Sequence, residues 1–176
     1  RRQRQMCIRD RNIHSLWLDK DNSLWLGLFL KGALHYIPHL NRTVDYNLLS
    51  EEVSSGFCII EDKNDHVWYG GPSGLFLIDK KKANARPEKI SPLRIFNLVQ
   101  FNDSILWAGT RKGSMFQINT RTLKVTSLPI LPHTDLYVTY IYPDSHQRIW
   151  IGTDNNGLYV SDRNGSIIAS YSKEQL

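Results

Sequence analysis

Hydrophobic residues along this chain recur in short alternating runs that are separated by polar turns. One such stretch is "RIWIGTDNNGLYV", Arg148 to Val160, and three earlier stretches resemble it closely: "SLWLGLFLKGALHYI" from Ser23, "HVWYGGPSGLFLI" from His66 and "ILWAGTRKGSMFQI" from Ile105. Each contains a tryptophan, a glycine two residues later, a polar turn and a second apolar run. Alternation of this length between turn residues predicts β-strands.

The spacing of the four stretches predicts a repeat array. Their tryptophans, Trp25, Trp68, Trp107 and Trp150, are 43, 39 and 43 residues apart, and each unit divides at its turn residues into four short strands. We expect strands at 13–19, 23–27, 32–37 and 43–47; 56–61, 66–70, 74–79 and 87–90; 94–101, 104–109, 113–119 and 122–127; and 136–143, 148–152, 157–161 and 166–171. Four strands per roughly 40 residues are typical of a propeller blade. The predicted fold is therefore all-β: a partial β-propeller of four consecutive four-stranded antiparallel blades, about 13–48, 56–90, 94–128 and 136–171.

Turn residues precede each tryptophan. Asp19, Asp62 and Asp144 stand six positions before it, where a carboxylate can accept a hydrogen bond from the backbone two residues on, whereas the third unit has Phe101 there. The residues three positions before each tryptophan are Asn22, Asp65, Ser104 and Gln147. The first two tolerate a positive φ better than the last two. We therefore expect hairpin geometry to vary between blades.

The tryptophans and glycines of the repeat have predicted structural roles. A tryptophan supplies about 150 to 250 Å² of apolar surface and is expected to fill the gap between adjacent blades. A side chain at the repeated glycine is expected to clash with a neighbouring backbone. These glycines are Gly27, Gly70, Gly109 and Gly152. Some aromatic residues of the inner strands are expected to face a channel and others a neighbouring blade, and most are expected to lie in the core. These residues are Trp17, Tyr137, Tyr140 and Tyr142.

Charge is concentrated at the beginning of the chain. The sequence has 176 residues, of which 41% are hydrophobic and 22% charged, with a net charge of +5. Five of the 22 basic residues fall within residues 1–12, which contain one acid, Asp10, and fit no repeat. We expect this segment to be non-native or a disordered basic arm; such an arm could bind acidic surfaces or nucleic acid. The remaining residues are nearly neutral, so no nucleic-acid partner is expected of the repeats themselves.

Candidate chemistry is sparse. Cys58 lies inside an apolar run and is expected to be a buried hydrophobe. The stretch "DKDNS" from Asp19 lacks the glycine and glutamate of a calcium loop, and His35 and His39 are separated by strand-like residues and Pro38 rather than by a helix. No catalytic residue, metal site or cofactor is expected, and no apolar run approaches the roughly 20 residues of a membrane span.

The most complete unit, "PDSHQRIWIGTDNNGLYV" from Pro143, resembles the two-component regulator propeller repeat, and the resemblance covers residues 13–171. Leu28 and Gly71 depart from the threonine found at Thr110 and Thr153, and Ser114 replaces a leucine. The resemblance implies the periplasmic sensor region of a hybrid two-component histidine kinase, which forms a homodimer, connects to the membrane through segments outside this chain and responds to oligosaccharides. It also implies a seven-bladed ring, of which these four blades would be a fragment and residues 172–176 the connection to the next blade.

Ligand residues are expected on one face of the blades. If strands run outward in order, the loops between second and third strands share a face with the loops that lead into the next blade. Candidate ligand-binding residues there are Lys31, Arg111, Lys112, His133, Asp154 and Asn155. Two alternatives remain open: a scaffold for protein interaction, or part of a lyase or hydrolase propeller whose active site lies in missing blades.

Overall fold

The computed structural model describes residues 12–46, 55–111, 114–128 and 137–172. The first sheet contains β1 (Ile13–Leu18), β2 (Leu24–Leu28), β3 (Gly32–Ile37) and β4 (Arg42–Asp45). The second contains β5 (Cys58–Glu61), β6 (His66–Gly71), β7 (Gly74–Asp79) and β8 (Glu88–Ser91). The third contains β9 (Asn97–Asn102), β10 (Ile105–Gly109), β11 (Met115–Asn119) and β12 (Val125–Ser127). The fourth contains β13 (Val138–Pro143), β14 (Ile149–Thr153), β15 (Leu158–Ser161) and β16 (Ile167–Tyr171).

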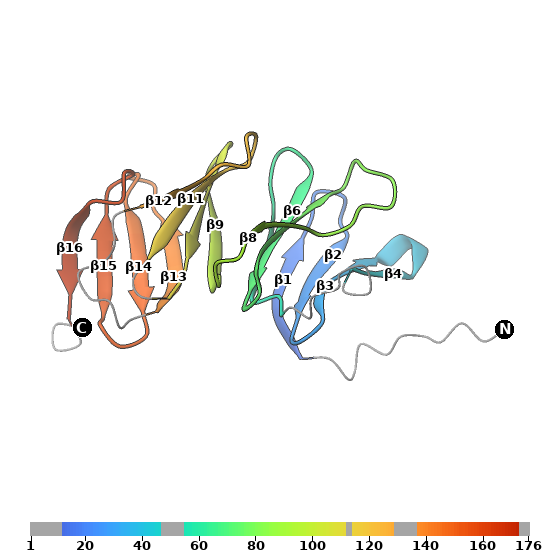
Figure 1. Cartoon of the computed structure of the whole chain (residues 1–176), viewed down its shortest axis with the longest axis horizontal. Coiled ribbons are helices and arrows are strands. Elements are labelled where there is room, and N and C mark those ends of the chain that lie inside the picture. The colour runs from blue at the N-terminus through green and yellow to red at the C-terminus, as the bar shows by residue number, and fades with distance from the viewer. Residues whose placement is uncertain (1–11, 47–54, 112–113, 129–136, 173–176) are drawn as a thin grey trace.

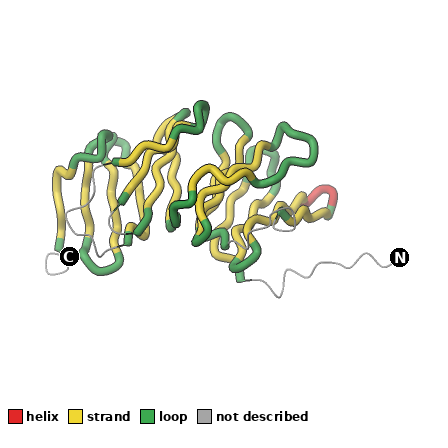
Figure 2. Tube along the Cα trace, viewed as in Figure 1, coloured by secondary structure: helices red, strands yellow, loops and turns green. Residues whose placement is uncertain are grey.

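These strands form four antiparallel sheets, each in simple sequence order, which stand side by side (Figure 1). The inner strands β1, β5, β9 and β13 contact one another in turn. Within the described residues the helical part is one 3-10 turn, η2 (Pro38–Leu40), at the tip of the β3–β4 hairpin (Figure 2). The predicted all-β partial propeller of four-stranded blades is confirmed.

Two strands begin three residues later than the sequence pattern predicts. β12 starts at Val125 rather than at residue 122, because the Asn119 side chain accepts hydrogen bonds from the amides of Arg121 and Thr122 and closes a tight turn. β9 starts at Asn97 rather than at residue 94. Just before it, the Ile95 amide donates to the carbonyl of Gly71 in the preceding sheet. Both strand starts are set by hydrogen bonds that the alternation of apolar and polar residues does not predict.

The core lies between successive sheets and is centred on the repeated tryptophans. Trp25, Trp68 and Trp107 are fully buried. Each one clusters with residues of the following sheet: Trp25 with Ile59 and Tyr69, Trp68 with Leu98 and Leu106, and Trp107 with Ile141 and Ile151. Trp150 is half-buried, since no sheet follows the fourth among the described residues. The predicted interblade role is therefore confirmed for the first three tryptophans.

Three of the four repeated glycines are required by close approach. A Cβ at Gly27 would overlap the carbonyl of Gly56, and a Cβ at Gly70 or Gly109 would lie 2.6 Å from Ile95 Cγ2 or Val138 Cγ1. Each obstacle belongs to the segment that leads into the next sheet. The prediction is wrong for Gly152, whose nearest neighbour would be Tyr140 Cβ at 3.6 Å, an ordinary contact.

The aromatic residues of the inner strands also differ between the earlier sheets and the fourth sheet. Trp17 is half-buried and packs against the cores on either side of the second sheet. Tyr140 and Tyr142 are 62% and 57% exposed, so the prediction that they belong to the core is wrong. Tyr142 stands eight residues before its tryptophan, as Trp17 does, and lacks a following sheet to cover it.

The aspartates close the hairpins as predicted. Oδ1 of Asp19, Asp62 and Asp144 accepts the amide two residues later, at 2.9, 2.7 and 2.8 Å. Oδ2 of each also accepts the indole N–H of the tryptophan six residues later, at 3.0, 2.8 and 3.0 Å, which sequence reasoning missed. In the third sheet Phe101 replaces the aspartate, and Trp107 Nε1 is buried with no hydrogen-bond partner among the described residues.

Hairpin geometry varies between the sheets as expected. Asn22, Asp65 and Gln147 have φ of 57°, 67° and 62°, whereas φ of Ser104 is not positive. Gln147 adopts this conformation although its side chain favours it weakly. Asp144 Oδ1 accepts the amides on both sides of it, those of His146 and Arg148, and so imposes the turn.

Candidate ligand-binding face

A row of aromatic rings crosses all four sheets at one edge. It consists of His14, Phe57, Phe96 and Tyr137, which we call the aromatic track. The ring centroids of successive members are 5.4 Å, 6.0 Å and 5.3 Å apart. Phe29 extends the row, with its ring 5.5 Å from that of His14. His14 is exposed and the other three members are half-buried, so each ring retains some surface that faces solvent.

The repeat places these rings. The first three stand 11 residues before the repeated tryptophan, where each inner strand begins. Backbone hydrogen bonds hold them there: the Phe57 amide donates to Gly70 O at 2.8 Å and the Phe96 amide to Gly109 O at 2.9 Å. Because the inner strands all run in the same direction, their first residues meet at one edge of the array.

Two arginines lie over the track. The Arg94 guanidinium is 5.2 Å from the Phe96 ring centroid and 6.0 Å from that of Phe57. The Arg111 guanidinium is 4.9 Å from the Tyr137 ring centroid. Both side chains are exposed. Cation–π contacts of this kind hold the guanidinium groups beside the rings without neutralising their charge.

The structure brings two of the predicted ligand residues to the track. Arg111 covers Tyr137, and Asp154 Oδ1 accepts the Tyr137 amide at 3.0 Å. Lys31 and Asn155 are exposed in the β2–β3 and β14–β15 loops, at the same edge of their sheets but without a contact to the track within the described residues. The other two predicted residues, Lys112 and His133, lie outside the described residues.

Sequence reasoning missed most of the track. His14, Phe57, Phe96 and Arg94 were not among the candidates, and Tyr137 was expected in the core. A signal was present, because an aromatic or imidazole ring recurs 11 residues before the tryptophan in three units.

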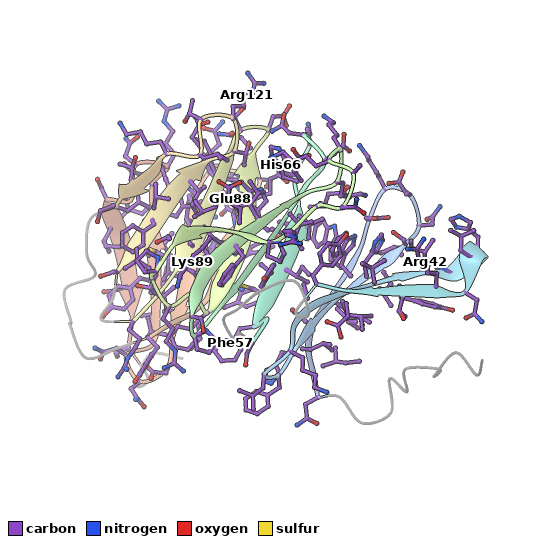
Figure 3. The ribbon with its side chains drawn as sticks, turned by 45° about the vertical axis from the view of Figure 1, so that its right-hand side comes forward. Arg42, Phe57, His66, Glu88, Lys89 and Arg121 are labelled. Carbon is purple, nitrogen blue, oxygen red and sulfur yellow. The ribbon has the colours of Figure 1, made fainter. Side chains whose placement is uncertain are left out.

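Figure 3 shows Phe57 at one edge of the sheets, with His66 and Arg121 at the opposite edge.

The opposite edge carries a partly buried ionic cluster between the first and second sheets. Lys80 Nζ donates to Asp19 Oδ2 at 2.8 Å, to Glu61 Oε1 at 2.8 Å and to Asp21 Oδ2 at 2.9 Å. We call these four residues the Lys80 cluster. Their three carboxylates could surround a metal ion, but the ammonium group of Lys80 already binds all three. The cluster therefore joins the β1–β2 turn to the second sheet.

Ionisation in this cluster is strongly biased towards the charged forms. Burial by itself would raise the pKa of Asp19, but hydrogen bonds from Lys80, Ser23 and Trp25 outweigh it and hold that pKa well below its ordinary value. Burial would likewise lower the pKa of Lys80, and its three carboxylate partners raise it instead. Both groups are charged at neutral pH.

One comparison concerns the fourth sheet. A family model described as "Two component regulator propeller" matches residues 133–155, which include the Trp150–Gly152 unit. Residues 133–155 of this chain are therefore similar to the two-component regulator propeller repeat. The resemblance seen in the sequence is thereby confirmed.

One similar protein is much longer than this chain. Histidine kinase P4 of Formosa agariphila is 27% identical over 168 residues, which cover 84% of this chain and 12% of that protein. The chain thus spans about an eighth of the curated relative it matches. In the described residues no helix is long and apolar enough to cross a bilayer.

Solved structures share the fold at low sequence identity. The extracellular domain of the putative hybrid two-component system BT4673 from B. thetaiotaomicron matches with a TM-score of 0.76 and 21% identity, over 94% of this chain and 23% of that one. PorZ, a surface component of the type-IX secretion system of Porphyromonas gingivalis, matches with a TM-score of 0.74 and 15% identity, over 94% of this chain and 28% of that one. At these identities the likeness establishes the fold.

Proposed function

We propose that this chain is part of the extracytoplasmic sensor propeller of a two-component signalling receptor and that its aromatic track binds oligosaccharides without transforming them. The observation that carries the proposal is the row of rings from His14 to Tyr137, which crosses four blades. The names of two similar proteins, a histidine kinase and the extracellular domain of a hybrid two-component system, support the sensor role.

The chemistry of the track suits a chain of sugar rings. Half-exposed aromatic faces offer flat apolar surface to the apolar faces of sugars, while nearby polar groups fix orientation. Arg94 and Arg111 add two positive charges that no described carboxylate pairs with. Guanidinium groups bind carboxylates and sulfates with paired hydrogen bonds, so an acidic oligosaccharide fits this face best.

A sensor must couple binding to a change of state. A ligand shifts a conformational equilibrium only through different affinities for the two states. A linear oligosaccharide lying along the track would contact successive blades at once and would favour one spacing between them. We propose that the remaining blades and a second copy of the receptor respond to that spacing.

The test is calorimetric titration of the receptor's complete sensor region with neutral and acidic glycan fragments. Phe57→Ala, Phe96→Ala and Arg111→Ala should each weaken binding by about tenfold or more, which corresponds to about 1.4 kcal/mol. Two exposed arginines away from the track provide controls, Arg121→Ala and Arg163→Ala. These controls should leave the affinity unchanged.

Three results would reject the proposal. Binding that survives both phenylalanine substitutions would exclude the track as the glycan site. Binding to no glycan in the panel, together with capture of a protein partner, would favour the scaffold alternative. Turnover of any fragment would favour the lyase or hydrolase alternative.

A further inference from the structure

A cleft of about 560 Å³ lies between the β3–β4 hairpin and the loop that joins β7 to β8. Small-molecule sites are typically about 300 to 1,000 Å³. The cleft shares no residue with the aromatic track, and Figure 3 shows Arg42 of the cleft on the β4 ribbon and Phe57 of the track at the lower edge of the sheets. It is therefore a separate feature of the molecule.

The lining of the cleft is strongly basic. Its charged residues are Arg42, Lys80, Lys82 and Arg86, and no carboxylate lines it. Two of these cations already have anionic partners: Lys80 binds three carboxylates, and Lys82 Nζ lies 3.7 Å from Asp79. Arg42 and Arg86 are exposed, and neither forms an ion pair with a described residue. Two guanidinium groups thus remain for an external anion.

The rest of the lining consists of rings and small apolar groups. Trp25 stacks on His35, with centroids 4.1 Å apart and an interplanar angle of 9°, and lies 5.3 Å from Tyr46. Val44 and Ala85 complete the apolar part. Burial lowers the pKa of His35 to about 4, so its imidazole is neutral at pH 7 and contributes polarity without charge. Such a surface accommodates a ring better than a bare inorganic ion.

From this combination we propose that the cleft is a second binding site, for a small anion built on a ring, such as a monosaccharide that carries a carboxylate or a sulfate. Arg42 and Arg86 hold the anionic group, because a planar guanidinium matches the oxygens of either group in pairs. The ring of the ligand lies against the half-buried Tyr46, Val44 and Ala85, and Trp25 is buried behind them. Since Arg42 belongs to β4 of the first sheet and Arg86 to the loop between β7 and β8 of the second, the ligand joins the two blades.

The test titrates the 176-residue chain with glucuronate, glucose 6-sulfate and glucose, and follows the indole ¹H–¹⁵N signal of Trp25 by NMR. At least one acidic sugar should shift this signal in a saturable way, and added salt should weaken the effect. Glucose should not shift it. The two acidic sugars distinguish a carboxylate ligand from a sulfate ligand.

Matched variants locate the site. Arg42→Gln and Arg86→Gln should each weaken binding at least fivefold, and Arg121→Gln, an exposed arginine outside the cleft, should leave it unchanged. Arg111→Gln separates this site from the proposed track, because it should alter track binding and leave the Trp25 shift intact. The proposal is thus tested independently of the track.

Clear outcomes would overturn the proposal. Absence of a Trp25 shift with both acidic sugars in the unsubstituted chain would do so without reference to any variant. Equal binding of glucose and glucuronate would exclude the arginines as the basis of recognition. Binding that is unchanged in folded Arg42→Gln and Arg86→Gln proteins, as judged by circular dichroism, would place the ligand elsewhere.

Discussion

The indole N–H of Trp68 donates a 2.8 Å hydrogen bond to Oδ2 of Asp62, six residues earlier in the chain. Oδ1 of the same carboxylate accepts the amides of Asn64 and His66. Asp62 is 4% exposed and Trp68 is fully buried. One buried carboxylate therefore connects the β5–β6 turn to the tryptophan that packs against the third sheet.

Removing this carboxylate should be costly. Asp62→Ala leaves a buried indole N–H and two turn amides without their acceptor, and each unpaired buried group costs about 1 to 3 kcal/mol. We expect the free energy of unfolding, measured with urea, to fall by about 2 to 4 kcal/mol. Asp103→Ala is the control, because its side chain is 68% exposed, and it should change stability by less than about 0.5 kcal/mol. Equal effects would contradict the role assigned to Asp62.

Two tryptophans with different hydrogen bonding offer an internal comparison. Trp68→Phe removes the indole N–H that donates to Asp62 Oδ2. Trp107→Phe removes an indole N–H that is buried and has no partner among the described residues. Both substitutions lose similar packing. Trp68→Phe should therefore lower the free energy of unfolding by about 1 to 2 kcal/mol more than Trp107→Phe. A larger loss for Trp107→Phe would be inconsistent with this difference.

The repeated glycines should differ in their tolerance of a methyl group. In Gly70→Ala the new Cβ would lie 2.6 Å from Ile95 Cγ2 and 3.0 Å from Cys58 Sγ, so the second and third sheets must shift apart. Overpacking of this kind costs about 1 to 3 kcal/mol. Gly152→Ala meets only ordinary contacts and should be nearly neutral. Thermal unfolding of the two variants measures the difference, and an equal loss would refute the interblade explanation.

Equivalent positions in the first and second sheets should respond unequally to truncation. Leu16 and Ile59 both stand nine residues before their tryptophan, yet Leu16 is 58% exposed and Ile59 is 6% exposed. Ile59→Ala should destabilise the chain by about 2 to 4 kcal/mol, and Leu16→Ala by less than about 0.5 kcal/mol. Urea unfolding provides the test. A substantial cost at Leu16 would mean that another surface covers it.

The Lys80 cluster should make stability depend on pH in the acidic range. The folded-state pKa of Asp19 lies below its ordinary value of 3.8, so its contribution is complete above about pH 4 and is lost as the pH falls through the folded value. The pKa of Lys80 is raised above 10.5, so its contribution is complete below that pH and is lost only at higher pH. Stability should therefore decline below pH 4.

A substitution isolates this effect. Lys80→Met leaves Asp19 and Glu61 buried without their cation and should lower the free energy of unfolding by about 2 to 3 kcal/mol at pH 7. Between pH 4 and pH 3 this variant should lose less further stability than the original chain. Lys63→Met is the control, since Lys63 is 66% exposed. Urea unfolding at pH 7, 4 and 3 measures both quantities. Parallel pH profiles for the Lys80→Met and original proteins would exclude the cluster as the source.

The periodic pattern was sufficient to predict the repeat, the order of the strands and the aspartate-closed hairpins. These features depend on residues that are near one another in the chain, such as Asp62 and Asn64, and on alternation that reports which side of a strand is apolar. Spacing also placed Arg111 and Asp154 at one edge, because every inner strand begins at that edge. The sensor role and the glycan ligand came from the family resemblance and stay proposals.

Only the tertiary structure decided what covers each face. Alternation marks Tyr142 and Trp17 as equivalent, yet one is exposed and the other packed, because the neighbour that covers such a residue comes from another sheet. The same reason explains why the aromatic track and the Arg42–Arg86 cleft escaped sequence analysis. Successive members of the track, and the two arginines of the cleft, are 39 to 44 residues apart in the chain. They meet because successive blades stack with their inner strands in the same direction.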